Sequence, residues 1–334
     1  MGLKENILAE FCSKVCKKKD QAIIGTATYR PYQIFLETME PWERTINASA
    51  DYPQELDILI QKQRKSLKIP ISINAIAPDQ QYSLPGRRKV FVFIQNPKNP
   101  LEYETLVGSC KRSTTLNFFR SLFASQQSPF TGSIDLNSLD KNFSIAAEKN
   151  TRDIMLCCHG QRDPCCGTFG LEIYNYLRNH SKTQQENCRI WKTSHIGGHK
   201  FAPTLIEFPS MRVWGHITQE SAEKISFQHE PVSDLIHNYR GFSGFQHPFE
   251  QVAEKDFFQE MSWNYPDKMP IKWRSKKNKE DHSGSIEILN RNGAVFFSSI
   301  VKQTGSSASQ ASCFDSKIKS YPLFHCSSKT HSLL

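Results

Sequence analysis

The sequence predicts an α/β protein whose C-terminal part is rich in β-strands. Short apolar runs typical of buried strands alternate with segments that carry apolar residues at helical spacing. The strongest apolar run, Val90–Ile94, has the length of a buried strand and is too short to cross a bilayer. Near the C-terminus, two strand-like runs flank Asn290–Gly293, a pattern typical of a β-hairpin.

Residues 1–149 are predicted to form an N-terminal α/β domain. Thr114 is expected to cap a helix that buries Leu116, Phe119 and Leu122. The segment that follows is rich in Ser, Asn and Gly, which is typical of a loop or linker. The expected elements are strands at 32–37, 69–76, 89–94 and about 103–107, helices at 53–67 and 114–125, and a loop at 126–142.

A second domain is predicted at 150–265, followed by a β-hairpin extension and tail at 266–334. The second domain contains a helix expected to bury Leu171, Tyr174 and Leu177. The Ser-rich last 30 residues are expected to be partly frayed. The expected elements are strands at 153–157, 188–193 and 211–216, a helix at 170–177, a helical region from 220 to about 263 that is interrupted at Pro231 and Gly241–Gly244, and hairpin strands at 285–289 and 294–301.

The composition indicates a soluble protein rather than a disordered, fibrous or membrane-spanning one. Of the 334 residues, 38% are hydrophobic, and the formal net charge is +9. The basic residues are dispersed and no nucleic-acid-binding motif accompanies them, so we expect no nucleic-acid partner. The N-terminus has no apolar signal core, and Asn6 breaks the myristoylation pattern. We therefore expect a cytoplasmic protein.

The cysteines are unevenly distributed. Four of the ten fall within ten residues, namely Cys157, Cys158, Cys165 and Cys166. In an intracellular chain such clustering indicates metal or redox chemistry rather than structural disulfides. By contrast, Cys12 and Cys16 have no histidine nearby and are expected to be ordinary thiols.

Two pairs of candidate ligands follow strand-like runs: Cys157 with Cys166, and His195 with His199. Loops at strand ends can converge on one centre, and the intervening Gly197-Gly198 pair permits a tight turn. Thiolate and imidazole ligands suit zinc and iron–sulfur clusters. The cysteine spacing is wider than that of a typical structural zinc site. Spacing alone does not decide between zinc and an iron–sulfur cluster. It also leaves open whether Cys158 or Cys165 replaces a proposed ligand.

Two motifs resemble the sucrase/ferredoxin-like family. They are Cys157-Cys-His-Gly-Gln-Arg-Asp-Pro-Cys-Cys-Gly167 and His195-Ile-Gly-Gly-His-Lys-Phe-Ala202. The N-terminal half is similar as well, at Phe11-Cys-Ser13, Ile24–Ala27 and Glu40-Pro-Trp42, so the resemblance spans most of residues 10–220. The forms Cys-Cys-Gly-x-Phe-Gly and Phe-Ala-Pro-Thr-Leu-Ile look most like the cyanobacterial members.

The resemblance implies a thioredoxin-like ferredoxin fold at 150–265 that binds a [2Fe–2S] cluster through Cys157, Cys166, His195 and His199. Such a protein would carry single electrons between a protein donor and a protein acceptor. Imidazole ligands remove negative charge from the cluster, which raises its potential and couples it to pH. No paired carboxylates indicate a glycosidase, so we expect an electron carrier rather than a hydrolase.

Two other functions compete with this interpretation. One is a structural zinc-binding interaction module, and the other is a thiol-based thioredoxin-like oxidoreductase, although a Cys-x-x-Cys motif is missing. Among the neighbouring residues, Lys200 and Arg162 are candidate donors to cluster sulfurs. His159 and Asp163 are expected to have structural roles, with Asp163 accepting hydrogen bonds from backbone N–H groups of its loop.

Overall fold

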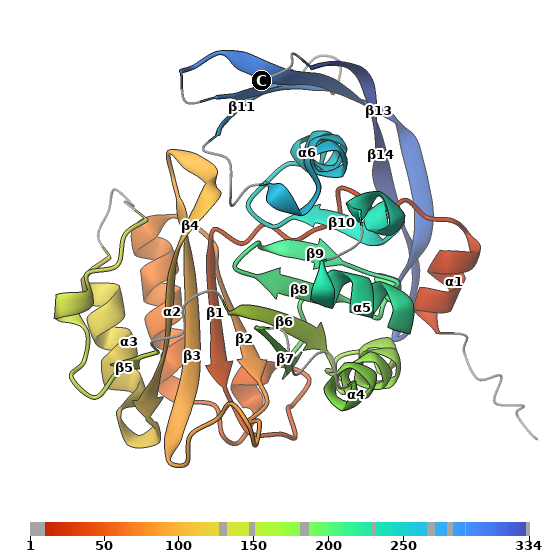
Figure 1. Ribbon diagram of the computed structural model, residues 1–334. Coiled ribbons are helices and arrows are strands. Elements are labelled where there is room, and N and C mark those ends of the chain that lie inside the picture. The colour runs from red at the N-terminus through yellow and green to blue at the C-terminus, as the bar shows by residue number, and fades with distance from the viewer. Residues whose placement is uncertain are drawn as a thin grey trace, which may run out of the picture.

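The computed structural model describes residues 11–126, 132–146, 151–180, 187–228, 231–265, 271–278, 283–290 and 292–331. The N-terminal signal and lipidation expectations concern residues 1–10, and the expected start of the second domain is residue 150. Both lie outside the described residues. Within the described part, strands form a ten-stranded mixed sheet and a separate four-stranded sheet, accompanied by six α-helices (Figure 1). The predicted α/β class with a β-rich C-terminal extension is confirmed.

The N-terminal half of the large sheet follows the order strand, helix, strand, strand, strand, helix. The first two strands are parallel and each later strand is antiparallel to its neighbour, in the spatial order β2-β1-β3-β4. The elements are β1 (Tyr32–Glu37), α2 (Gln54–Leu67), β2 (Ile71–Ile76), β3 (Arg87–Asn96), β4 (Asn99–Lys111) and α3 (Thr115–Ala124), with the short edge strand β5 (Ser144–Ile145) beyond β4.

The second half repeats this order. Its spatial arrangement is β7-β6-β8-β9, again with the first two strands parallel and the others antiparallel. This order, with the first strand flanked by the second and third, is the thioredoxin-like arrangement without a helix before the third strand. The elements are β6 (Arg152–Cys157), α4 (Leu171–Asn179), β7 (Cys188–Thr193), β8 (Leu205–Phe208), β9 (Arg212–Trp214) and α5 (Gln219–Phe227), followed by the edge strand β10 (Tyr239–Phe242).

The two halves join through their equivalent second strands. β2 pairs antiparallel with β7 through Ile76 and Thr193, so the halves are related by an approximate twofold axis at this junction. The sheet is thus continuous across the two α/β domains predicted from the sequence, and their division near residue 150 stays a prediction. The shared topology shows that the two halves are related in architecture.

Aromatic side chains pack the two halves together. The Phe93 ring lies 4.1 Å from that of Phe208, and the Phe91 ring lies 5.6 Å from that of Trp191, measured between centroids. Side chains that alternate with Phe91 and Phe93 along the strands point to the opposite face of the sheet. There, α2 and α3 cover Ile34 and Val92. Both faces of the central strands are therefore buried, which explains why β3 has a continuous apolar run rather than an alternating one.

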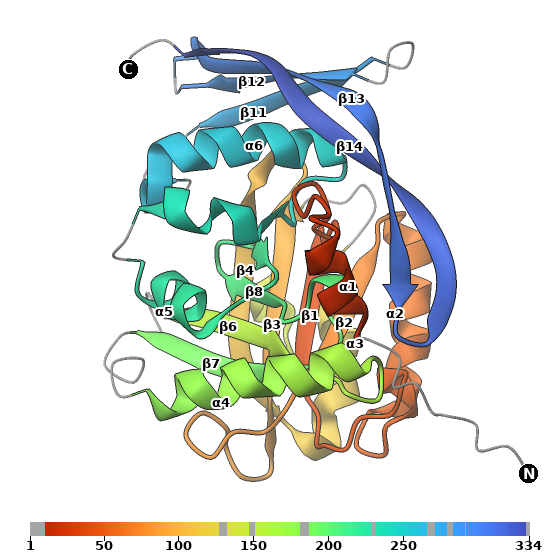
Figure 2. The ribbon, with the colours of Figure 1, turned by 90° about the vertical axis from the view of Figure 1, so that its right-hand side faces the viewer.

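The C-terminal extension is a four-stranded antiparallel sheet that covers helix α6. Phe257 of α6 packs against Phe296 and Phe297 of β13. The last two strands leave this sheet and run down the side of the molecule to α1 (Figures 1 and 2). The strands of the extension are β11 (Lys272–Lys277), β12 (Ser283–Leu289), β13 (Val295–Ser312) and β14 (Asp315–His331). The helices that they contact are α1 (Cys12–Lys18) and α6 (Pro248–Met261).

Three local expectations are wrong. The Ser-rich tail is not frayed where it is described, because β13 and β14 pair along almost their whole length. Residues 239 and 240, expected to be helical up to the interruption at Gly241–Gly244, instead begin strand β10, because they complete the sheet edge beside β9. Leu171 is 41% exposed, and Ile173 is buried instead. A π-helical turn at Cys166–Gly170 precedes α4 and rotates the face that this helix presents to the core.

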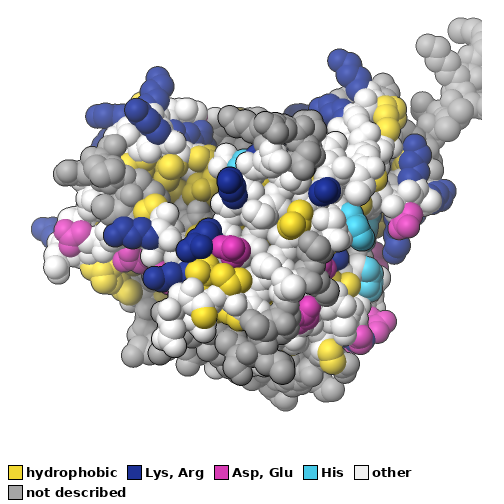
Figure 3. Space-filling view, turned by 90° about the horizontal axis from the view of Figure 1, so that it is seen from above, with side chains coloured by type: hydrophobic (Ala, Val, Ile, Leu, Met, Phe, Trp, Pro, Cys, Tyr) yellow, Lys and Arg dark blue, Asp and Glu magenta, His cyan; other side chains and the backbone are white. Residues whose placement is uncertain are grey.

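Charge on the surface follows the sequence expectation of a dispersed basic excess. On the face seen from above, Lys and Arg side chains lie at several separate places rather than in one patch (Figure 3). Among the described residues, no helix combines the length and the apolar character needed to cross a bilayer.

Candidate metal centre

Three of the four predicted ligands meet inside the second half of the sheet. Cys157 is the last residue of β6, Cys166 opens the π-helical turn, and His195 follows the end of β7. The parallel strands β6 and β7 are neighbours, so their carboxyl ends deliver these loops to the same edge. The Sγ atoms of Cys157 and Cys166 lie 3.8 and 3.7 Å from Nδ1 of His195, and the three ligand atoms all lie within 4.8 Å of one another.

The fourth predicted ligand, His199, lies beside this group but outside it. The centroids of the His195 and His199 rings are 5.1 Å apart. Nε2 of His199 lies 3.8 Å from a carboxylate oxygen of Asp163, and 17% of the His199 side chain is exposed. Both histidines are therefore half-buried, whereas both thiols are fully buried.

The Gly197-Gly198 turn has the geometry expected from the sequence. Gly197 and Gly198 have φ values of +92° and +76°, a region that favours glycine. A Cβ atom at Gly198 would lie 2.6 Å from Nη1 of Arg240, which is far too close. The pair thus lets the histidine loop pass directly over a buried guanidinium group.

Polar side chains hold the carbonyl groups of three successive residues in the histidine loop. Asn74 Nδ2 donates to the carbonyl of His195 at 2.9 Å, and Arg30 Nη2 donates to that of Ile196 at 2.7 Å. Arg240 Nη1 donates to the carbonyl of Gly197 at 2.9 Å. These contacts come from β2, from the segment before β1 and from β10. The loop is therefore fixed by elements of both halves of the sheet.

Arg30 and Arg240 are the functional candidates that the sequence analysis missed. Both guanidinium groups are buried, and burial lowers the pKa of each to about 10, so both remain cationic at neutral pH. Both also interact electrostatically with the Cys157 thiol. A buried cation beside a metal centre favours added negative charge there. The sequence signal was one isolated arginine before the strand-like run at 32–37 and another in the expected helical region, a pattern that usually indicates surface.

His159 and Asp163 have the structural roles expected of them. Nδ1 of His159 accepts a hydrogen bond from the backbone N–H of His195 at 3.3 Å, and its Nε2 lies 2.9 Å from the carbonyl oxygen of Glu43. Asp163 accepts a hydrogen bond from the backbone N–H of Cys165 at 3.0 Å. The cysteine loop is thereby braced internally and against the histidine loop.

The two thiols of the group differ in acidity because they lie in hydrogen-bond contact. The pKa of Cys157 is well below the usual range, since Cys166 donates to its sulfur and His195 stabilises the thiolate. The pKa of Cys166 is raised for the same reason, as it is the partner that keeps the proton. Metal ligation requires both thiols to be deprotonated, so metal binding at this site releases protons.

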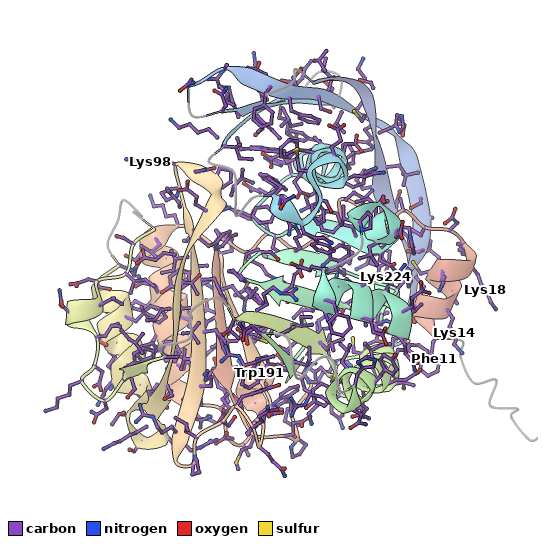
Figure 4. The ribbon with its side chains drawn as sticks, in the orientation of Figure 1. Phe11, Lys14, Lys18, Lys98, Trp191 and Lys224 are labelled. Atoms are coloured by element: carbon purple, nitrogen blue, oxygen red, sulfur yellow. The ribbon has the colours of Figure 1, made fainter. Side chains whose placement is uncertain are left out.

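Other residues near the two loops in the sequence are placed as follows. Cys158 lies outside the ligand group found among the described residues, and Cys165 belongs to a different thiol cluster. Lys200 points away from the predicted ligands, with Nζ 3.2 Å from the hydroxyl of Ser309 and above the ring of Tyr321. Trp191 lies in the interior, and its indole N–H donates to Asp153 (Figure 4), so its role is packing.

Two buried thiols with two imidazoles form a donor set that suits a [2Fe–2S] cluster, and the buried guanidiniums suit the negative charge that such a cluster acquires on reduction. A pocket of about 380 Å³ opens beside His199 and is lined by Thr26, Lys200, Arg240 and Tyr321 among others. This pocket gives solvent and other molecules access to the histidine edge of the site.

His216 packs against the histidine loop and predicts acid sensitivity. Burial, aided by repulsion from Lys17, lowers the pKa of His216 to about 4 from 6.5. The unfolded chain therefore binds a proton at a higher pH than the folded one, and stability falls as the pH drops from 6.5 towards 4. We expect His216→Gln to reduce the loss of unfolding free energy between pH 6.5 and 5 by roughly 1–2 kcal/mol. Denaturant titrations of both proteins measure this; equal losses would contradict it.

Comparison with known proteins agrees with these observations. Residues 23–241 match the family model described as Sucrase/ferredoxin-like. A 70-residue stretch is 39% identical to altered inheritance of mitochondria protein 32 of Candida glabrata, and it spans 21% of this chain and 22% of that protein. A thioredoxin-like [2Fe-2S] ferredoxin from Aquifex aeolicus aligns with 26% of this chain and 90% of its own, at 19% identity and a TM-score of 0.22. Because the family model covers more than half of its length, the chain belongs to the sucrase/ferredoxin-like family.

Proposed function

We propose that the protein is a one-electron carrier with a [2Fe–2S] cluster bound by Cys157, Cys166, His195 and His199. The observation that carries this proposal is the convergence of two buried thiols and the His195 ring within 4.8 Å, with a second imidazole beside them. When bound, the cluster supplies a redox couple that accepts and returns a single electron.

The surrounding residues support this chemistry in two ways. Asn74, Arg30 and Arg240 hold the histidine loop rigidly, which limits reorganisation when the charge of the centre changes. Arg30 and Arg240 also stabilise the more negative, reduced state. The partly exposed edge of His199 faces the pocket, so we infer that a protein donor or acceptor approaches there.

The His199→Cys variant tests the proposal. We expect wild-type protein that is purified without oxygen to be reddish-brown and to contain about two iron atoms per chain. In the variant, a thiolate replaces a neutral imidazole and adds negative charge. The cluster should be retained, with a midpoint potential lower by on the order of 100 mV and less dependent on pH. Absorption spectra, iron analysis and potentiometric titration from pH 6 to 10 provide the measurements.

The matched control is His237→Cys, which introduces the same residue at an exposed histidine outside the site. Its spectrum and potential should equal those of the wild type. Colourless wild type with zinc and no iron would favour the zinc-binding module, because the spacing of Cys157, Cys166 and His195 also suits one tetrahedral ion. Redox activity that survives metal removal but is lost on thiol alkylation would favour the thiol-based oxidoreductase.

A further inference from the structure

A second cluster of potential metal ligands lies next to the first and uses none of the same residues. Cys12 of α1, Cys165 of the cysteine loop and Cys313 in the turn between β13 and β14 converge there with Asp163. Sγ of Cys165 lies 3.5 Å from Sγ of Cys12 and 3.3 Å from Sγ of Cys313. The four ligand atoms all lie within 4.8 Å of one another. Three segments that are far apart in the sequence therefore meet at one point.

Contacts between thiol groups alone do not explain why these three segments meet. A thiol is a weak hydrogen-bond donor and a weak acceptor, so three of them give little energy to hold three chain segments together. A disulfide needs two sulfurs at about 2.05 Å and would leave the third thiol unpaired. In a tetrahedral zinc site with Zn–S bonds of about 2.3 Å, the sulfurs lie roughly 3.8 Å apart, close to the spacing found here.

The candidate ligands are mostly buried, and backbone hydrogen bonds orient two of them. Cys12, Cys165 and Asp163 are at most 1% exposed. The backbone N–H of Cys12 donates to the sulfur of Cys313 at 3.3 Å, and that of Cys313 donates to Asp163 at 3.1 Å. Hydrogen bonds of this kind orient metal ligands and stabilise their charged forms.

The mixed donor set points to one metal. Three sulfurs and a carboxylate suit zinc, whereas copper(I) prefers sulfur alone and magnesium or calcium prefers oxygen alone. The apolar side chains of Phe11, Phe169 and Ala202 pack around the cluster. Figure 4 shows Phe11 on the side of α1 that approaches α4. This closed environment is typical of a structural zinc site, which keeps no open coordination position.

We propose that Cys12, Cys165, Cys313 and Asp163 bind one structural zinc ion. The ion fastens helix α1 and the β13–β14 hairpin to the cysteine loop that also carries Cys166. Figure 2 shows this hairpin reaching down from the small sheet to the level of α1. Asp163 lies between the two centres, since its carboxylate is also 3.8 Å from Nε2 of His199. The zinc site thus braces the loop of the proposed redox centre without sharing a predicted ligand with it.

Metal analysis of the full-length protein, purified with a thiol reductant, tests the proposal. We expect about one zinc per chain, and a zinc K-edge absorption spectrum that reports three sulfur ligands and one oxygen. Cys313→Ser should lower the zinc content at least tenfold, while iron and the visible spectrum stay close to wild type. Cys326→Ser is the matched control, because this half-buried cysteine lies on the same hairpin, near Ser299 and outside the cluster. It should retain zinc.

Several results would overturn the zinc site. They are wild type with less than a tenth of a zinc per chain, zinc content unchanged in Cys313→Ser, or mass spectra of the reduced preparation that show Cys165 bonded to Cys12 or Cys313. If Cys313→Ser fails to fold, Cys12→Ser and the K-edge spectrum of wild type still decide the question. Iron-free protein with about two zincs per chain would overturn the proposed redox function and leave this site standing.

Discussion

Gly198→Ala should lose most of its bound iron and 2–4 kcal/mol of unfolding free energy, an order-of-magnitude estimate. Gly198 has φ of +76°, where an alanine side chain is strained. The new Cβ would also lie 2.5 Å from Cζ of Arg240. Arg240 cannot move aside, because its guanidinium is buried and bonded to the carbonyls of Gly197 and Thr26. Relief of the clash must therefore displace the loop that carries His195 and His199.

Gly86→Ala separates backbone strain from this clash. Gly86 has φ of +71°, and a Cβ atom there would meet nothing within 4 Å. This control should lose only about 1 kcal/mol and keep its iron. Denaturant unfolding and iron analysis of both variants measure the difference. If Gly198→Ala behaved like Gly86→Ala, the close approach of the histidine loop to Arg240 would have no role in the site.

The sequence was most informative where local signals and function coincide. The strands Tyr32–Glu37 and Cys188–Thr193 end where the apolar patterns predicted, because the central strands are buried on both faces and their runs are continuous. The glycine pair between His195 and His199 predicted a tight turn, and both glycines have positive φ. The residues that give each signal lie close together in the sequence, so the signal can be interpreted without knowledge of the tertiary fold.

The sequence was least informative where partners are distant. The partners of Cys12 lie 153 and 301 residues away, too distant to be recognised from the sequence, and the expectation that it is an ordinary thiol stays a prediction. Arg30 and Arg240 could not be assigned, because only the fold shows that they are buried against the histidine loop. Beyond Val301, the Ser-rich strands β13 and β14 have few of the residues that favour strands. Their order comes from pairing with each other and from contacts with α1, not from intrinsic preference.

The similarity of the two halves of the sheet was also not predicted from the sequence. Both follow the same order of strands and helices, yet only the second half carries the cysteine and histidine loops at the ends of its parallel strands. The equivalent end of β1 instead carries Glu37, which lies 3.4 Å from Arg112 and close to Ser83. One half therefore holds the candidate centre, and the other contributes support, through Asn74 of β2 and through Arg30.

Arg240→Met should lower the midpoint potential of the bound cluster by tens of millivolts and destabilise the fold by roughly 3 kcal/mol. The substitution removes a buried positive charge beside the thiol ligands, so the extra electron of the reduced state is less stabilised. It also leaves the carbonyls of Gly197 and Thr26 without their donor. Potentiometric titration and denaturant unfolding measure the two effects separately.

Arg212→Met distinguishes an electrostatic effect from general destabilisation. Arg212 is as buried as Arg240, but its guanidinium lies 3.8 Å from the centroid of the Phe258 ring and donates to the carbonyl of Tyr265, on the side of α6. Its loss should cost similar stability and leave the potential within about 10 mV of wild type, because its charge interacts with the buried carboxyl group of Glu207. Equal shifts in the two variants would mean that the potential follows the integrity of the fold. A shift confined to Arg240→Met would show that the charge of this arginine raises the potential.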